Sequence, residues 1–374
     1  MLFGGVLMDL EIYDKNYELL GVLDNFELLK WNRRYYIPGK FEITCPLTTD
    51  NLELLKKGNI IYKSGDEAGF IDYRNIKLSS LGNEVLYIKG EFLTGFLGRR
   101  IIWDQLCYTG TVEGLCRKIV EENCINPKNL NRRIPLLSLG ALKNFSEAIE
   151  YQNSYGNIIN ELEGLSRSYG MGYKVKFNYD LRMLEFEVYK GLDRTDSQNI
   201  NDKALFSRQY ENILEQDYIE SLVDYRNTAL IAGEGEGTNR KMASIEKGIG
   251  LERYEFYVDA RDLRSTKQVG DSEVVIPDNE YTSMLTQRGY SKLEEHKEVL
   301  CFDSVINTSA YQESLIYKTD YDLGDIVTVY DEKWNITVDT RITEVEEIYQ
   351  NSGMSINVIF GNDMPTIYNK IKRM

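Results

Sequence analysis

A single histidine is the first residue of this chain whose type could carry out acid–base chemistry or bind a metal. His296 lies in the polar stretch KLEEHKEVL. A Ser-His-Asp or Cys-His site would have to use this residue, and no Gly-x-Ser-x-Gly elbow accompanies it. A transition-metal site usually contains two or more His or Cys residues close together. We therefore interpret His296 as a histidine on a solvated helix.

A glycine-rich loop has the residue types of a nucleotide site. Gly233-Glu234-Gly235-Glu236-Gly237 has the spacing GxGxG rather than GxGxxG, and no helix is predicted directly after it. Its two glutamates would repel a pyrophosphate where backbone N–H groups should attract one. We interpret the segment as a wide turn, and we expect no cofactor.

An acidic cluster near the C-terminus has the ligand chemistry of calcium. Asp320, Asp322 and Asp325 lie close together in the sequence. They lack the 12-residue register of a calcium loop, with its central glycine and terminal bidentate glutamate. Glycine permits a tight turn and Asp bonds the local backbone, so we interpret Gly324-Asp325, like Gly58, as a structural turn. We expect no metal site.

Charged residues form two short groups in this acidic chain. One interpretation is a solvated surface with ordinary ion pairs, each of which stabilises little. The other is a charge-matched interface between subunits, in which Arg side chains meet carboxylates and set the register. Both interpretations stay open. The candidate interface residues are Arg33, Arg34, Asp259, Arg261, Asp262 and Arg264.

The composition limits the class of protein. A chain of 374 residues with 42% hydrophobic residues is long enough for two or three domains with real cores. The net charge of −15 argues against specific nucleic-acid binding and suits a soluble assembly component. The five cysteines form no CxxC pair, so we interpret them as reduced core residues of a protein made in a cytoplasm. No transmembrane segment is predicted, and the apolar residues 1–7 leave Met8 as an alternative native start.

Strand patterns dominate the first hundred residues. Residues 7–104 show short apolar runs with turn signals between them, which predicts mostly β structure. One short helix is expected there, capped by Thr49 or Asp50 and ended by Gly58.

The spacing of apolar residues becomes helical from about residue 105. Thr109 or Thr111 is expected to cap a first helix, and Ser154 precedes a second helix that Gly170 ends. An alternating hairpin follows this helix. Farther along, the patterns predict strands at 219–230 and 252–259, a helix at 284–299, and a β-meander from residue 315.

Two of the predicted meanders echo one another. Gly58 opens one that closes at Gly90, and Gly324 opens another that closes at Gly361. A β-unit used twice in one chain suggests a ring-forming protein. We expect an α+β fold, mainly β, in which two tube-like β-barrel domains surround an inserted α/β portion. The expected domains are 1–104 (first barrel), 105–210 continued by 245–312 (α/β), and 211–244 with 313–374 (second barrel).

Three motifs in order resemble a family of tail proteins from siphophages and related prophages. They are WNRRYYIPGKFEITCPL with GEFLTGFLGRRII, then NTALIAGEGEG with ERYEFYVDARDL, and finally YDLGDIVTVYDEKWNITVDTRITEVE. The resemblance spans Met8 to about Pro365. Such proteins are similar to the baseplate hub of phage tails, tailocins and contractile injection systems.

The resemblance implies a structural protein rather than an enzyme. It implies a homotrimeric, pseudo-six-fold ring that joins the tail tube to the central spike and contacts other baseplate proteins. A tape-measure protein would pass through the lumen, and the protein would lie in the tail baseplate of a virion or phage-tail-like particle. Two alternatives stay open. One is a tail-associated peptidoglycan hydrolase using some of the 59 Asp and Glu residues, and the other is a receptor-binding tail protein using the 27 tyrosines.

Overall fold

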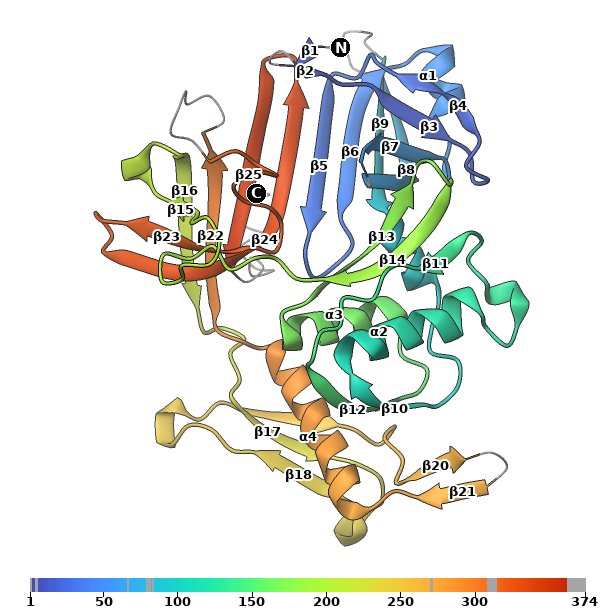
Figure 1. Ribbon diagram of the computed structural model, residues 1–374, viewed down its shortest axis with the longest axis vertical. Coiled ribbons are helices and arrows are strands. Elements are labelled where there is room, and N and C mark those ends of the chain that lie inside the picture. The colour runs from blue at the N-terminus through green and yellow to red at the C-terminus, as the bar shows by residue number, and fades with distance from the viewer. Residues whose placement is uncertain are drawn as a thin grey trace.

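The computed structural model describes residues 2–3, 6–65, 67–78, 82, 84–269, 272–307 and 315–361. The described chain is mostly β, and the expected α+β class with inserted α/β portions is confirmed (Figure 1). Thirteen of the described strands belong to one sheet, in which one path runs β16-β22-β25-β24-β5-β6-β9-β8-β7-β3-β4. None of the described helices is long and apolar enough to cross a membrane.

The first half of this sheet comes from the N-terminal part of the chain. Its strands are β3 (Leu10–Tyr13), β4 (Leu19–Leu23), β5 (Leu28–Arg34), β6 (Lys40–Pro46), β7 (Ile60–Ser64), β8 (Glu67–Leu78) and β9 (Glu84–Phe92). The helix α1 (Thr49–Leu54) lies between β6 and β7, and its cap is Thr48, one residue before the position expected from the sequence. A separate two-stranded hairpin, β1 (Leu2–Phe3) with β2 (Val6–Leu7), precedes this half. Trp31 and Phe41 stack within the buried core of this half.

The second half comes from later segments of the chain. Its strands are β15 (Leu205–Phe206), β16 (Ile213–Ser221), β22 (Val299–Ile306), β23 (Ile326–Asp331), β24 (Ile336–Gln350) and β25 (Gly353–Gly361). Its core is a different cluster, which includes Phe206, Phe302 and Phe360. Each half of the sheet therefore has its own core cluster, and Tyr349 of β24 packs in the cluster of the first half.

The two halves have the same strand order. In the first half a hairpin (β5-β6) joins a meander (β9-β8-β7), and in the second half a hairpin (β16-β22) joins a meander (β25-β24-β23). The middle strand of each meander carries a register shift, between Ile71 and Tyr73 in one and between Ile342 and Glu344 in the other. The echo predicted from the sequence is therefore a repeat of topology.

The opening turns of the two meanders make equivalent backbone bonds. The N–H of Gly58 donates to the carbonyl of Ile71 at 2.8 Å, and the N–H of Ile71 donates to Asn59 at 2.9 Å. In the second meander, the N–H of Gly324 donates to the carbonyl of Ile342 at 2.9 Å, and the N–H of Ile342 donates to the carbonyl of Asp325 at 2.8 Å. Both glycines have a positive φ, +90° at Gly58 and +95° at Gly324, which favours glycine.

The closing glycines of the two meanders are not equivalent. Gly90 lies opposite Ile71, whereas the residue opposite Ile342 is Phe360, one position before Gly361. A Cβ at Gly90 would approach the carbonyl of Phe70 to 1.9 Å, so glycine permits a close approach between two strands there. The sequence pairing of Gly90 with Gly361 is therefore off by one residue.

An α/β portion connects the two halves. Its elements are β10 (Leu106–Thr111), α2 (Val112–Val120), β11 (Leu137–Leu139), β12 (Ala148–Asn153), α3 (Ile158–Tyr169), β13 (Gly172–Asn178) and β14 (Met183–Tyr189). Thr111 caps α2 as predicted, and Gly170 ends α3 in the left-handed conformation. Ser154 precedes α3 as expected, and the cap itself is Asn157, whose side-chain oxygen accepts from the N–H of Ile159 at 3.0 Å.

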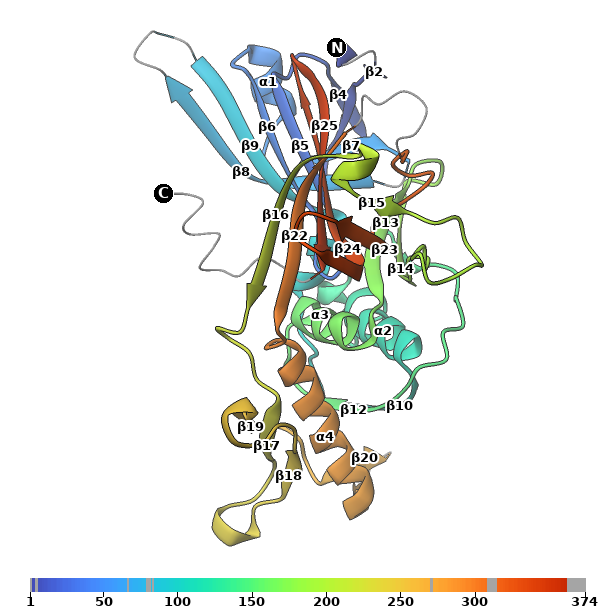
Figure 2. The ribbon, with the colours of Figure 1, turned by 90° about the vertical axis from the view of Figure 1, so that its left-hand side faces the viewer.

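A small unit is inserted between β16 and β22 and extends away from the sheet (Figures 1 and 2). Its elements are β17 (Thr228–Ala232), β18 (Met242–Ile245), β19 (Glu255–Asp259), β20 (Thr266–Val269), β21 (Ser272–Val275) and α4 (Asp278–Glu294). Residues 211–244 divide between two cores, because Ile213 packs with the second half and Ala229 packs with α4. The domain boundaries expected from the sequence stay predictions; the structure shows which residues share a core.

Candidate functional site at the seam of the sheet

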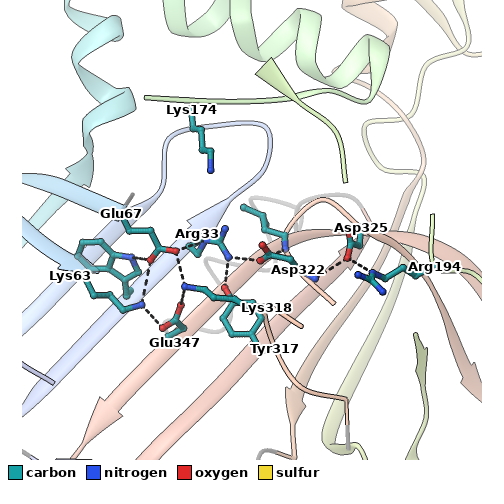
Figure 3. Close-up of polar contacts among 12 residues, drawn as sticks. Arg33, Lys63, Glu67, Lys174, Arg194, Tyr317, Lys318, Asp322, Asp325 and Glu347 are labelled. Carbon is teal, nitrogen blue, oxygen red and sulfur yellow. Dashed lines mark hydrogen bonds and ion pairs between the residues drawn. The ribbon is translucent and has the colours of Figure 1, made fainter. Parts of the chain in front are cut away.

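The two halves of the sheet join edge to edge where β5 pairs antiparallel with β24. Arg33 lies opposite Val345 and Trp31 lies opposite Glu347 across this seam. Three cationic and three anionic side chains gather at the seam, from β5, β7, β8, β24 and the segment before β23 (Figure 3). They are Arg33, Lys63, Lys318, Glu67, Asp322 and Glu347.

Glu67 is the centre of this seam cluster. Its carboxylate accepts hydrogen bonds from Trp31 Nε1 at 2.8 Å and from Lys318 Nζ at 2.9 Å. Arg33 Nε lies 3.1 Å from Glu67 Oε1, and Lys63 Nζ lies 3.4 Å from Oε2. Burial alone would raise the pKa of Glu67, but Lys63, Arg33 and Lys318 together lower it to about 2.

Lys63 and Glu347 form the most enclosed ion pair of the cluster. Their side chains are only 2% and 3% exposed. Glu347 also accepts a hydrogen bond from the hydroxyl of Tyr349 at 2.5 Å, and Lys318 Nζ lies 3.7 Å from its other oxygen. A buried pair of this kind depends on both partners, because removal of one leaves an uncompensated charge.

Arg33 extends the cluster toward the second half of the sheet. Its Nη1 lies 2.5 Å from Asp322 Oδ1 and 2.6 Å from the hydroxyl of Tyr317. Burial lowers the pKa of Arg33, but Tyr317, Glu67 and Asp322 outweigh it and leave the pKa well above its usual value. With three positive and three negative groups, the charges of the cluster balance one another.

Asp325 fastens the α/β portion to the turn before β23. Its carboxylate accepts from the backbone N–H of Leu192 at 2.7 Å and from Arg194 Nε at 2.9 Å. The N–H of Asp322 also donates to it at 2.9 Å. Asp325 is therefore a buried anchor between segments as well as the turn residue predicted from the sequence.

The acidic cluster considered for calcium is occupied by protein groups. Asp322 pairs with Arg33, Asp325 pairs with Arg194, and Asp320 Oδ2 accepts from the N–H of Ile316 at 2.7 Å. Within the described parts of the chain there is no group of three or more His, Cys, Asp or Glu residues that could hold a metal ion.

The candidate interface residues lie in two separate places. Arg33 and Arg34 are on β5 at the seam, where Arg34 Nε lies 3.1 Å from Glu344 Oε1. Asp259 ends β19 in the inserted unit and the other three follow it, so the structure does not bring the two groups together (Figure 1).

The four candidates in the inserted unit have local partners. Asp259 pairs with Arg261 at 2.5 Å and with Arg240 at 3.1 Å, and Asp262 pairs with Arg288 of α4 at 3.0 Å. The backbone N–H of Arg264 donates to the side-chain oxygen of Gln152 in β12, with a distance of 2.6 Å between N and Oε1. The three ion pairs lie within the inserted unit, and the Arg264–Gln152 contact attaches the unit to the α/β portion.

The histidine and the glycine-rich loop also have structural partners. His296 lies in the turn after α4 rather than on the helix, and its ring packs 4.5 Å from that of Phe256. The loop carboxylate of Glu234 accepts from the N–H and the hydroxyl of Ser265, at 2.7 and 2.6 Å. The Tyr281 hydroxyl accepts from the Glu234 N–H at 2.9 Å.

Sequence reasoning missed Lys63, Glu67 and Glu347. Lys63 and Glu347 lie 284 positions apart in the chain, and no local pattern marks them. One signal was present, because charged residues inside the apolar runs of β7 and β24 break the strand pattern.

Comparison with known proteins identifies the family to which this chain belongs. The model of the family described as "Siphovirus ReqiPepy6 Gp37-like protein" matches residues 9–362. The chain belongs to this family of siphovirus tail proteins, and the resemblance found in the sequence motifs is confirmed. No curated protein sequence matches the chain.

Solved tail proteins share the fold at low sequence identity. The tail protein from Neisseria meningitidis MC58 is 14% identical, with a TM-score of 0.56, and the match covers 96% of this chain and 97% of that one. The 43 kDa tail protein of prophage MuSo2 from Shewanella oneidensis is 9% identical, with a TM-score of 0.56 and coverages of 94% and 97%. Prophage tail protein gp18 from Listeria monocytogenes EGD-e is 13% identical, with a TM-score of 0.56 and coverages of 97% and 97%.

Proposed function

We propose that the protein is the structural hub of a phage tail or phage-tail-like particle. Three copies form a ring that joins the tail tube to the central spike and contacts other baseplate proteins. In this role the protein has no catalytic activity, and its place is the baseplate of the particle. Family membership supports a role in the tail, and the more specific role follows from the repeat within the sheet.

The observation that carries the proposal is the repeated strand order within one chain. The two halves are joined at β5 and β24, and each half supplies a hairpin and a meander in the same order. Three such chains present six similar β-units around one axis. A ring of this kind matches six-fold symmetry on one side and three-fold symmetry on the other, which is what a joint between a tube and a spike requires.

The charge of the chain suits such a ring. With a net charge of −15, the protein offers little attraction to nucleic acid or to an acidic segment that passes through a lumen. The seam cluster supports a structural role for the buried charges, because each of its cations pairs with a carboxylate of the same chain.

Mass measurement of the purified protein and of isolated tails tests the proposal. We expect three copies per particle, and a trimer in solution at high protein concentration or once a tube or spike partner is added. A chain that stays monomeric with these partners and is absent from particles would contradict it. Clearing of purified cell walls by the protein would instead favour a hydrolase, and binding to host cells by the isolated chain would favour a receptor-binding protein.

A further inference from the structure

The internal seam gives a template for a second seam, which the single chain leaves incomplete. In the internal seam β5 lies antiparallel to the outer edge of β24, beyond the register shift in that strand. The repeat relates β5 to β16 and β24 to β8. A pairing of β16 with β8 would therefore repeat a contact that the chain already makes.

The first correspondence, between β5 and β16, follows from the pairing of each hairpin with its meander. Phe41 lies opposite Gly90 and Phe302 lies opposite Phe360, so Phe41 and Phe302 are equivalent. Trp31 lies opposite Phe41, and Tyr218 lies opposite Phe302. Both pairs stack, with ring centroids 5.6 and 4.4 Å apart. Trp31 of β5 therefore corresponds to Tyr218 of β16.

The second correspondence, between β24 and β8, follows from the turns and the register shifts. Ile71 and Ile342 make the same backbone hydrogen bonds to the opening turns of their meanders. In each strand the register shift comes directly after this residue. Tyr73 is therefore equivalent to Glu344, and three residues farther along Ile76 is equivalent to Glu347. Because Glu347 lies opposite Trp31 in the internal seam, the repeat places Ile76 opposite Tyr218.

Within the described residues, neither edge needed for this second seam pairs with a further strand. β16 is the last strand of the sheet path, and beyond Ile71 the described residues of β8 pair only with β9. Figure 2 shows β8 and β9 projecting from the body of the molecule. Tyr73, Ile76 and Leu78 on β8 are 46%, 51% and 68% exposed, which is unusual for the apolar residues of a strand edge.

We propose that β16 of one copy pairs antiparallel with β8 of a second copy, in the register that the internal seam defines. The inference rests on the proposed ring and names the contact that closes it. The residues that face each other across this seam between copies are Tyr73 and Ser221, Arg74 and Glu220, Asn75 and Ile219, Ile76 and Tyr218, Lys77 and Asp217, and Leu78 and Gln216.

The side chains of the two edges complement one another in this register. Both cations of the β8 edge, Arg74 and Lys77, lie opposite carboxylates, Glu220 and Asp217. A shift of the register by one or two residues in either direction removes at least one of these two pairs. The register comes from the backbone equivalence alone, so the charge match is an independent observation in its favour.

Both edges carry buried polar atoms. The Nε of Arg74 and both polar atoms of the Gln216 amide are buried without a hydrogen-bond partner among the described residues. Leaving such atoms unpaired costs free energy, and in this register the carboxylate of Glu220 from a second copy lies opposite Arg74 as an acceptor. Gln216 lies opposite Leu78, whose side chain offers it no hydrogen bond.

Disulfide trapping in the full-length protein tests the register. In the variant Ile76→Cys with Tyr218→Cys, we expect oxidation to link neighbouring copies into species of two and three chains on a non-reducing gel. The matched control is Ile76→Cys with Leu214→Cys, in which the second cysteine lies four positions away, roughly 13 Å along the strand, beyond disulfide reach. Equal cross-linking in both variants, or none in a chain that still trimerises, would overturn the pairing.

Charge reversal gives a second, reversible test. Arg74→Glu places two carboxylates opposite one another, and we expect it to weaken trimer formation about tenfold. Adding Glu220→Arg restores the pair with its signs exchanged and should recover most of the loss, whereas an equally weak double variant would count against the contact. The unfolding midpoint of the monomer serves as the folding control.

The outcomes separate this inference from the proposed function. A ring of three copies without the Ile76–Tyr218 cross-link overturns the seam and leaves the hub intact. A cross-link in a ring of another size supports the seam and overturns the trimer. A chain that assembles under none of these conditions, and is absent from tails, overturns both.

Discussion

The internal seam and the two edges at β16 and β8 use the same backbone arrangement in different chemical settings. The internal seam is built around a self-neutralising cluster in which Lys63 and Glu347 are almost fully enclosed. The two edges at β16 and β8 carry charges of opposite sign and exposed apolar residues. They also carry buried polar atoms that have no hydrogen-bond partner among the described residues. A permanent contact within a chain can bury ion pairs, whereas a contact that forms during assembly requires edges that are tolerated in water until then.

The two hairpins differ in a second way. The turn between β5 and β6 is short, whereas the turn between β16 and β22 contains the whole inserted unit. The pairing of β5 with β6 and the pairing of β16 with β22 nevertheless keep equivalent registers. The repeat is therefore maintained where strands meet strands, and it varies where the chain leaves the sheet.

Loss of Lys63 should have the largest effect on the internal seam. Lys63→Met leaves Glu347 and Glu67 buried with fewer positive partners, and we expect the free energy of unfolding to fall by about 3–5 kcal/mol. Chemical denaturation measures this loss. Lys56→Met is the matched control, because Lys56 pairs with Glu53 at an exposed position. The denaturation midpoint of this variant should equal that of the wild type. A Lys63 variant as stable as this control would show that the cluster does not hold the two halves together.

Acid should weaken the internal seam through Glu67. The folded-state pKa of about 2 lies below the usual value of 4.5, so the stabilisation is present above pH 4.5 and is lost as the pH falls toward 2. The loss attributable to Glu67 is at most about 3 kcal/mol. Between pH 6 and pH 2, the free energy of unfolding should fall more steeply with decreasing pH in the wild type than in Glu67→Gln. Identical slopes would contradict the lowered pKa.

The two equivalent turns should respond unequally to the same substitution. An alanine Cβ at Gly324 would lie 2.3 Å from Cε2 of Tyr35, whereas nothing lies within 4 Å of a Cβ at Gly58. Gly58→Ala should therefore cost only the strain of a positive φ, about 1–2 kcal/mol. Gly324→Ala should cost about 1–3 kcal/mol more because Tyr35 must move. If thermal unfolding shows that both variants lose the same amount of stability, the two turns have similar surroundings.

The smallest effect is expected at Arg261 in the inserted unit. Its side chain is 69% exposed and pairs with Asp259 at the surface. Arg261→Ala should leave the unfolding midpoint unchanged. If it nevertheless weakens assembly, the inserted unit contains a subunit contact of its own, and the edges at β16 and β8 are not the whole interface.

The sequence predicted the parts of the fold that depend on local chemistry. The Gly58 and Gly324 turns, the Thr111 cap and the Gly170 stop each need one residue type at one place, so a local pattern identifies them. The error at Gly361 has the same origin, because a glycine can satisfy a turn, a close strand approach or a left-handed φ. Spacing alone does not distinguish these roles.

The seam cluster could not be predicted in the same way. Its members come from β5, β7 and β8 of the first half and from β24 and the segment before β23 of the second half, so they meet only when the two halves of the sheet join. Strand patterns predict which face of a strand is buried, but they do not say which strands of different units become neighbours. Arg33 was selected from the sequence for its charge, whereas its partners Glu67 and Asp322 are set by the seam.

Cryo-electron microscopy of the assembled tail end, reconstructed without imposed symmetry, tests the central claim most directly. The repeat within the chain predicts three copies that present six similar β-units, with β16 of each copy against β8 of the next and Ile76 opposite Tyr218. A ring in which the β5–β24 seam is intact but the β16 and β8 edges meet solvent or another protein would contradict it.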